Sequence, residues 1–401
     1  MRTINGQASG AFAPIIGEAV TTRRPFYARS KAILVTPHLD MGCLGYAGCI
    51  TNGEKGTFLH PDTLWHADDL DQVKEGDIVC LNDSGTAIVL WEKDSLQNSL
   101  MLTEACNCNC LMCPQPPQKH APELLQQAEN ILDLLHGKHV PHICITGGEP
   151  TLLKDNFIRL LYRCTKEHPE SVINILTNGK TFSDMTFARD AAHAASANTL
   201  FCVSLHSEID QIHDELVGKK GSFDKTQLGI YNLAQCGAYI EIRHVITKLN
   251  YKRLLHFAEH VYSYFPFCSH YALMGLELCG YAAANKERIA VSPHEYKEEL
   301  ALAVLYMHRR GLPVSVYNIP LCLCTPRIRP FARQSISTWK NRYVQQCSEC
   351  TRQEDCAGFF STSVSLPLEH IQPIREGFSH FLRLRLYLFL IVLIVCRWLL
   401  A

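Results

Sequence analysis

Four cysteines lie within eight residues of the stretch TEACNCNCLMCPQPP, residues 103 to 117. Thiols this close together form disulfides in oxidising compartments and bind metals inside the cell. The N-terminal sequence lacks the run of about 7 to 15 apolar residues that marks a secretory signal. We therefore expect a cytoplasmic protein, and we interpret this stretch as a metal site.

The spacing of these thiols limits which metal they hold. Cys106, Cys110 and Cys113 are spaced C-x3-C-x2-C, and Cys108 lies inside the first interval. Three thiolates suit a cubane iron–sulfur cluster in which one iron keeps an open position, whereas structural zinc takes four ligands, commonly from two CxxC pairs. The one-residue gaps beside Cys108 are too short for easy tetrahedral chelation. Zinc bound by all four thiolates remains the alternative.

A second cysteine set lies near the C-terminus. Cys347, Cys350 and Cys356 are spaced C-x2-C-x5-C, and either Cys322 or Cys324 can return as a fourth ligand. Four thiolates make a closed site, which holds either an auxiliary [4Fe–4S] cluster or a structural zinc. The spacing does not choose between these two metals.

The elements that must position these residues follow from the hydrophobic pattern. Residues 1–98 contain short strand segments and a hairpin-type Asn-Asp-Ser-Gly turn at 82–85, which predicts a β-rich module. From residue 99, buried-type strands alternate with segments long enough for crossover helices, including predicted helices at 121–135 and 293–310. Six β/α units fit before residue 312. Six is fewer than eight, so we predict an α/β fold with an open, partial (β/α)6 barrel, followed by a cysteine-rich extension at 313–362 and a tail at 363–401.

Polar residues gather at the predicted C-terminal ends of the strands, where sites of parallel β/α folds lie. The first cysteine set follows the first strand, and a Gly-Gly-Glu-Pro turn follows the second. Further polar residues follow or end the later strands. They are Thr177, Asn178, Ser204, His206, Arg243 and Glu277.

The motifs CNCNCLMC, ITGGEP, LTNG and VSLHS, with HDELVGKKGSFDKTQLGIYNLAQCG, resemble the radical S-adenosylmethionine (SAM) enzyme superfamily over most of residues 100–285. The resemblance implies a [4Fe–4S] cluster on Cys106, Cys110 and Cys113 whose open iron binds SAM. More narrowly, LTEACNCNCLMCPQPP and the C-terminal cysteine pattern resemble the His-Xaa-Ser system radical SAM maturase family. That family implies post-translational modification of a ribosomally made precursor peptide with His-Xaa-Ser repeats.

The resemblance also assigns roles around the bound SAM. Gly147 and Gly148 lack a Cβ and so permit close approach to the bound amino acid. Glu149 and Pro150 complete the motif that receives the methionine amino group. On this view Cys106, Cys110 and Cys113 supply the metal ligands, and a low-potential electron donor reduces the cluster.

Residues on later strands have implied roles and open alternatives. Thr177 and Asn178 should face the methionine or ribose, and Ser204 the ribose hydroxyls. Arg243 is expected to pair with the methionine carboxylate, since a guanidinium fork matches a carboxylate, or else to be a surface-facing strand residue. His206 contacts ribose or substrate, or is structural. Glu277 accepts a proton or orients substrate, or makes structural hydrogen bonds.

For the second cysteine set, the resemblance to peptide-modifying maturases favours an auxiliary [4Fe–4S] cluster over zinc, with Cys322 as our chosen fourth ligand. The sequence departs from fuller seven-cysteine patterns, because the position four after Cys356 is Phe360. We therefore predict one auxiliary cluster. A partner maturase is a further expectation from the family.

Composition and the two ends of the chain add weaker expectations. The 38 Lys and Arg against 39 Asp and Glu give a net charge of -1, which argues against nucleic acid as a partner. The apolar run Leu386–Cys396 is shorter than the about 20 residues that span a bilayer. Membrane contact through the tail is one interpretation, and the alternatives are an interfacial or packed helix, or a non-native end to the reading frame. The N-terminal module is a candidate for leader-peptide capture by strand addition.

We therefore expect a radical SAM enzyme, an oxidoreductase that abstracts hydrogen from a peptide. Two alternatives remain: a radical SAM enzyme acting on a small molecule or RNA base, and a non-catalytic iron–sulfur or zinc protein.

Overall fold

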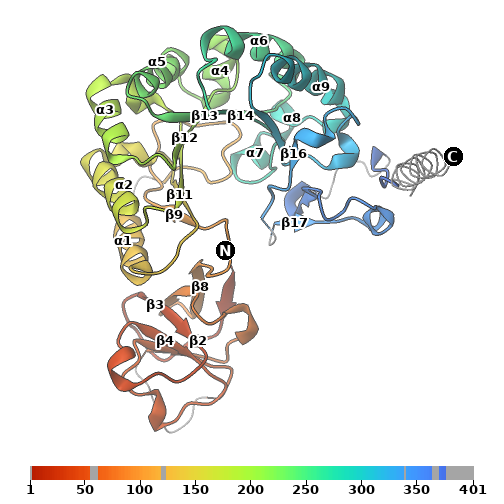
Figure 1. Ribbon diagram of the computed structural model, residues 1–401. Helices are drawn as coiled ribbons and strands as arrows, with labels where there is room; N and C mark the ends of the chain where they lie inside the picture. The colour runs from red at the N-terminus through yellow and green to blue at the C-terminus, as the bar shows by residue number, and fades with distance from the viewer. Residues whose placement is uncertain (1, 55–61, 119–122, 338–339, 364–369, 376–401) are drawn as a thin grey trace, which may run out of the picture.

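The computed structural model describes residues 2–54, 62–118, 123–337, 340–363 and 370–375 (Figure 1). The apolar run of the tail lies outside these residues. Within them, no helix is long and apolar enough to cross a membrane.

The N-terminal module is the β-rich unit that the sequence predicts. Its eight strands pair in the order β1-β8-β7-β3-β4-β5-β6-β2. The predicted hairpin turn joins β7 to β8, with Gly85 in the left-handed region at φ +84° and its N–H donating to the Asn82 carbonyl at 3.2 Å. The strands are β1 (Thr3–Asn5), β2 (Gln7–Ala8), β3 (Ile15–Val20), β4 (Ala32–Val35), β5 (Gly48–Ile50), β6 (Thr63–Trp65), β7 (Ile78–Asn82) and β8 (Thr86–Trp91).

This sheet closes on itself at Gly6. The two outermost strands, β1 and β2, are separated in sequence only by Gly6, so one N-terminal stretch pairs with β8 on one side and β6 on the other. A Cβ at Gly6 would lie 2.4 Å from the Trp65 carbonyl oxygen, which explains the glycine. Closure removes free strand edges, so the described strands do not favour our prediction of leader capture by strand addition at an exposed edge.

Residues 99–333 form a second sheet of eight parallel strands in consecutive order from β9 to β16, with helices on its outer side (Figure 1). The predicted six-strand partial barrel is confirmed, and β15 and β16 extend it past the boundary that we place at 312. The strands are β9 (Ser99–Met101), β10 (His142–Thr146), β11 (Val172–Thr177), β12 (Thr199–Ser204), β13 (Tyr239–Val245), β14 (His270–Met274), β15 (Val314–Tyr317) and β16 (Ala332–Arg333).

Alternation along each strand separates the core from the barrel interior. In β10, Ile143 and Ile145 are fully buried, while the alternate side chains of His142, Cys144 and Thr146 are half-buried. The buried face packs against helices such as α2, which contributes Phe157 and Leu160 to the same core. The helices are α1 (Glu123–Leu135), α2 (Asp155–Glu167), α3 (Met185–Ala194), α4 (Asp210–Val217), α5 (Ser222–Gln235), α6 (Leu254–Tyr264), α7 (Tyr281–Ala284), α8 (Lys286–Ile289) and α9 (Pro293–Arg309).

Helices α1 and α9 match the two helices predicted over 121–135 and 293–310. Helix α9 begins with Pro293 at its first position and with a capping box, in which Ser292 and Glu295 each accept a backbone N–H at the helix start. After β16, the strands β17 (Asn341–Arg342) and β18 (Phe359–Phe360) pair antiparallel and frame the second cysteine segment.

Candidate active site and second cysteine site

The loop after β10 packs directly on the cysteine loop after β9. Gly148 N–H donates to the Thr103 carbonyl at 2.7 Å, and Glu149 N–H donates to the Ala105 carbonyl at 2.9 Å. A Cβ on Gly147 would lie 2.6 Å from the Thr103 carbonyl oxygen, and one on Gly148 would lie 2.4 Å from that of Ala105. Both glycines are therefore needed for loop-to-loop contact, a role that the sequence analysis did not anticipate.

Glu149 is a buried side chain whose carboxylate oxygens accept hydrogen bonds from neighbouring protein groups. Its Oε1 accepts the hydroxyls of Thr151 at 2.6 Å and Thr177 at 2.8 Å, and its Oε2 accepts the backbone N–H of Asn178 at 2.7 Å. Burial raises the pKa of Glu149, and the hydrogen bonds from Asn178, Thr151 and Thr177 oppose that rise. The side chain joins the loop after β10 to the loop after β11, and Pro150 begins the short 3-10 helix that follows it.

The first cysteine set consists of free, mostly half-buried thiols. Contacts with the neighbouring thiols, that of Cys106 first, and with the Lys180 ammonium lower the pKa of the Cys108 thiol. Cys113 Sγ donates to the Gln115 carbonyl at 2.9 Å. Three free thiols on one short loop at a barrel rim have the donor chemistry that a [4Fe–4S] cluster requires.

Two of the strand-end residues make contacts of a structural kind. Thr177 is buried against Glu149. His206 is 5% exposed, its Nδ1 accepts the backbone N–H of Val245 at 3.3 Å, and its ring stacks on His213. The contacts of His206 favour the structural alternative, and contact with ribose or substrate stays a prediction.

Asn178 lies between the motifs, because its side chain donates to Asn107 Oδ1 of the cysteine loop at 2.7 Å. Ser204 ends β12 and stands in register with Arg243 on β13. Ser204 is half-buried. The predicted roles of Asn178 and Ser204 toward SAM stay predictions.

Arg243 belongs to a polar network inside the barrel. Its Nε donates to Glu241 Oε1 at 2.6 Å, and Glu241 Oε2 lies 2.8 Å from His270 Nδ1. His270 Nε2 lies 3.0 Å from Ser315 Oγ. Although burial alone would raise the pKa of Glu241, His270 and Arg243 lower it to about 2. Among the described residues, the terminal nitrogens of Arg243 have no hydrogen-bond partner, so they are free to bind a carboxylate.

Glu241 and His270 were not among the predicted site residues. The sequence did contain a signal for Glu241, because it stands two residues before Arg243 and therefore on the same face of the strand. No local signal connects His270 to that pair, because it comes from the next strand.

Glu277 follows β14 and is paired with Lys340, whose Nζ lies 2.9 Å from Oε1 and 3.0 Å from Oε2. The segment that follows Glu277 contacts the first cysteine loop, because the Tyr281 N–H donates to the Cys113 carbonyl at 2.8 Å. Gly280 has φ +54°, and a Cβ there would lie 2.4 Å from the Pro114 carbonyl oxygen. Glu277 is thus held near the first cysteine loop by a lysine from the C-terminal region.

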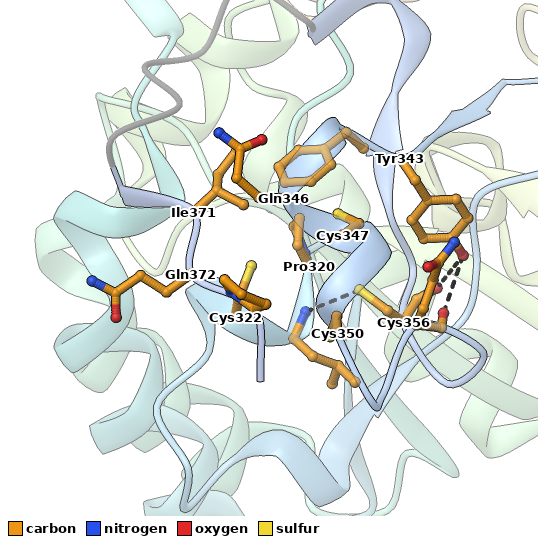
Figure 2. A pocket seen from close by; sticks show the side chains of 13 residues that line it. Pro320, Cys322, Tyr343, Gln346, Cys347, Cys350, Cys356, Ile371 and Gln372 are labelled. Atoms are coloured by element: carbon orange, nitrogen blue, oxygen red, sulfur yellow. Dashed lines mark hydrogen bonds between the residues drawn. The ribbon is translucent and has the colours of Figure 1, made fainter. Parts of the chain in front are cut away.

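The second cysteine set surrounds one pocket, which is also lined by Pro320 and Tyr343 (Figure 2). Cys356 Sγ accepts the backbone N–H groups of Leu321 at 3.3 Å and Gly358 at 3.4 Å. Cys324 does not line this pocket and is packed in the main hydrophobic core. The pocket therefore favours Cys322 over Cys324 as the fourth donor. Its cysteines are Cys322, Cys347, Cys350 and Cys356.

Within the described ranges, no three His, Cys, Asp or Glu side chains are already arranged to hold a metal ion. Both cysteine sets suit iron or zinc because their thiols are free and lie close together, on one loop for the first set and around one pocket for the second. Metal binding itself remains a proposal.

Comparison with known proteins finds a family match for part of the barrel. Residues 100–261 match the family described as the Radical SAM superfamily. The mycofactocin maturase MftC of Mycolicibacterium smegmatis is 33% identical over 160 residues, 39% of this chain and 39% of that protein. The sporulation killing factor maturation protein SkfB of Bacillus subtilis is 27% identical over 154 residues, 38% of this chain and 36% of that protein. A crystal structure of Streptococcus suis SuiB bound to S-adenosylmethionine aligns with 54% of this chain and 49% of its own, at 18% identity and a TM-score of 0.46.

Residues 100–261 thus match the radical SAM superfamily in a segment that belongs to the parallel partial barrel, and the C-x3-C-x2-C loop lies within this segment. MftC is named for the maturation of mycofactocin, and SkfB for the maturation of sporulation killing factor. The chain spans about two fifths of the length of the curated relatives it matches.

Proposed function

We propose that this protein binds a [4Fe–4S] cluster on Cys106, Cys110 and Cys113, cleaves SAM reductively, and abstracts hydrogen from a ribosomally made peptide. The observation that carries the proposal is the hydrogen-bonded junction of the cysteine loop with the Gly147–Pro150 turn at the strand ends of a parallel barrel. Sites of such barrels lie at this end.

The chain's own residues prepare this site. Gly148 and Glu149 hold the cysteine loop through backbone hydrogen bonds, and this loop carries the three proposed ligands. When bound, the cluster and SAM supply a carbon radical that removes a hydrogen atom. The terminal nitrogens of Arg243, oriented by Glu241, bind the methionine carboxylate. The paired Glu277 is the proton acceptor or orienting group on the substrate side.

A precursor peptide is the substrate that the relatives support. MftC and SkfB are named for the maturation of mycofactocin and of sporulation killing factor. The narrower resemblance of LTEACNCNCLMCPQPP adds His-Xaa-Ser repeats as the peptide's expected feature, and a partner maturase and a low-potential electron donor as further components.

The second cysteine set holds an auxiliary [4Fe–4S] cluster in this proposal, on Cys322, Cys347, Cys350 and Cys356. The N–H donors from Leu321 and Gly358 stabilise a thiolate at Cys356, as hydrogen bonds to ligand sulfurs do. Zinc is the other metal that four thiolates accept. Iron and zinc analysis of the purified protein decides between them.

The first experiment is anaerobic reconstitution of the full chain with iron and sulfide, followed by SAM and dithionite. We expect 5′-deoxyadenosine from the intact protein and none from a variant with Cys106, Cys110 and Cys113 changed to Ala. If the intact protein holds a full first cluster and forms no 5′-deoxyadenosine, the proposed chemistry is wrong.

The second experiment adds a synthetic peptide with His-Xaa-Ser repeats and follows its mass. A loss of hydrogen that depends on SAM, dithionite and the first cysteine set is expected. Deoxyadenosine formation without any peptide change, with and without candidate partner proteins, would contradict this substrate class and leave the radical chemistry standing.

A further inference from the structure

Cys108 lies inside the first cysteine set but outside its C-x3-C-x2-C spacing. Its side chain is 6% exposed and is held by two donors from another loop. Lys180 Nζ lies 3.3 Å from Cys108 Sγ, and Asn178 Nδ2 lies 3.7 Å from the same sulfur. This sulfur therefore has polar partners in the turn that follows β11, in addition to its contacts with the Cys106 and Cys110 thiols.

Lys180 is fixed in this position by the packing of its turn. It follows Gly179, which has φ +78°, and its N–H donates to the Asn178 side chain at 3.1 Å. Helix α5 packs directly against this turn. Thr226 Oγ1 donates to the Asn178 carbonyl at 2.9 Å. A Cβ at Gly229 would lie 2.1 Å from the Gly179 carbonyl oxygen, so the helix and the turn are in close contact.

A lysine ammonium in such a place needs partners, because burying an unpaired charge is costly. Lys180 is 8% exposed and makes two contacts, with the Asn107 carbonyl at 3.2 Å and with Cys108 Sγ. Both contacts lie on the cysteine loop, between two of the proposed ligands. The Lys180 amino group thus binds two neighbouring residues of the cysteine loop and holds them in place.

The same sulfur is a competitor for the cluster. A thiolate two residues from Cys106 and two from Cys110 is a better iron ligand than the amine and carboxylate of an amino acid. Unless something restrains it, Cys108 is an extra donor for the fourth iron on the same loop as the three proposed ligands.

We propose that Lys180, assisted by Asn178, holds the Cys108 sulfur as a non-ligand and so keeps the fourth iron position open for SAM. Lys180 is then a positioning residue of the site. This inference rests on the proposed function, since it requires a cluster on Cys106, Cys110 and Cys113. It excludes the four-thiolate zinc alternative for the first set.

The test uses the full chain, reconstituted anaerobically, in five forms: intact, Lys180→Met, Cys108→Ala, the double variant, and Lys220→Met as a control at an exposed lysine. Iron content and the electron paramagnetic resonance spectrum of the reduced protein are measured with and without SAM. Thermal unfolding of each form shows that it is folded.

We expect SAM to shift the spectrum of the intact protein, of Cys108→Ala and of Lys220→Met. Lys180→Met should keep its iron, lose that shift and bind SAM at least about tenfold more weakly, as loss of a supporting contact does at metal sites. The double variant should regain the shift, because the competing sulfur is gone.

Three results would overturn the inference: an unchanged shift in Lys180→Met, no recovery in the double variant, or loss of first-cluster iron in Cys108→Ala. The last result needs no Lys180 variant to fold. If the intact protein itself shows no shift and forms no 5′-deoxyadenosine, the proposed function fails, which is a separate outcome.

Discussion

The backbone N–H of Asn178 donates to Oε2 of Glu149 at 2.7 Å, and this bond joins the loops that follow two adjacent strands of the barrel. The same glutamate accepts the Thr151 and Thr177 hydroxyls, and its own N–H donates to the Ala105 carbonyl of the cysteine loop. Three sequence motifs are therefore connected through one buried side chain, and this connection makes Glu149 testable without any cofactor.

Changing Glu149 to Ala removes the acceptor of four hydrogen bonds, from the Thr151 N–H and hydroxyl, the Thr177 hydroxyl and the Asn178 N–H. Because each unsatisfied group costs about 1–3 kcal/mol, we expect the free energy of unfolding to fall by about 3 kcal/mol or more. Urea unfolding of the full chain measures this, with Glu170→Ala as a control at an exposed glutamate. Equal stability of Glu149→Ala and the intact protein would show that the hydrogen-bonded junction does not support the fold.

Gly148→Ala should disturb the cysteine loop and leave the rest of the fold intact. The new Cβ would lie 2.4 Å from the Ala105 carbonyl oxygen and 2.6 Å from that of Glu104, both of them backbone atoms. We expect a stability loss of about 1–3 kcal/mol and poor incorporation of iron at the first set. Gly10→Ala is the matched control, since nothing lies within 4 Å of its Cβ position. Normal iron incorporation in Gly148→Ala would contradict the close-contact argument.

Three buried histidines predict the dependence of stability on pH. The His206 ring lies 5.9 Å from that of His213 and 6.3 Å from that of His244. Burial lowers the pKa of all three, to about 4 for His213 and about 3 for His244. A histidine that stays neutral in the folded state favours folding above its unfolded pKa of about 6.5, and this contribution is lost as the pH falls below that value, where only the unfolded chain takes up the proton.

The check compares the intact protein with His206→Gln by urea unfolding at several pH values. Between about pH 6.5 and 5.5, removal of one such histidine should reduce the loss of stability by about 1 kcal/mol, and the difference in slope should approach about 1.4 kcal/mol per pH unit at lower pH. Identical slopes for the two proteins would mean that folding does not lower the pKa of His206, as expected of a histidine that is open to solvent.

The pocket of the second cysteine set gives Cys322 and Cys324 different expected roles in metal binding. Cys322 lines the pocket with three other thiols, whereas Cys324 is 3% exposed in the main core. We expect Cys322→Ser to lose the second metal, about four irons if it is a [4Fe–4S] cluster, and Cys324→Ser to retain it. Iron and zinc analysis after identical reconstitution measures both. A reversed result would place Cys324 in the site.

Local sequence patterns were sufficient for much of this architecture. The strand and helix alternation from residue 99 predicted six of the eight parallel strands and the helices α1 and α9, because buried strands and amphipathic helices leave periodic signals. The short strands β15 and β16 were missed because two to four residues carry almost no periodicity.

Contacts between distant segments were beyond the sequence. The pairing of Lys180 with Cys108 and that of Lys340 with Glu277 join side chains about 70 and 60 positions apart, and no spacing rule connects them. Gly147 and Gly148 were predicted to permit approach of a ligand, but the structure shows their Cβ positions filled by the cysteine loop backbone. Only the folded backbone reveals that reason.

The Glu277–Lys340 pair leads to a last prediction, on the separation of substrate chemistry from SAM cleavage. Lys340 holds both carboxylate oxygens of Glu277, at 2.9 and 3.0 Å, beside the segment that contacts the Cys113 carbonyl. If Glu277 handles a proton of the peptide, Glu277→Gln should slow peptide modification about 100-fold or more. Formation of 5′-deoxyadenosine without peptide should change by no more than about twofold, because Glu277 is not a ligand of the proposed cluster. Mass spectrometry of the peptide and quantitation of deoxyadenosine in the same reaction measure the two rates, with Glu287→Gln as a control at an exposed glutamate. Parallel loss of both rates would instead indicate that the Glu277–Lys340 pair supports the cysteine loop and has no separate role toward the substrate.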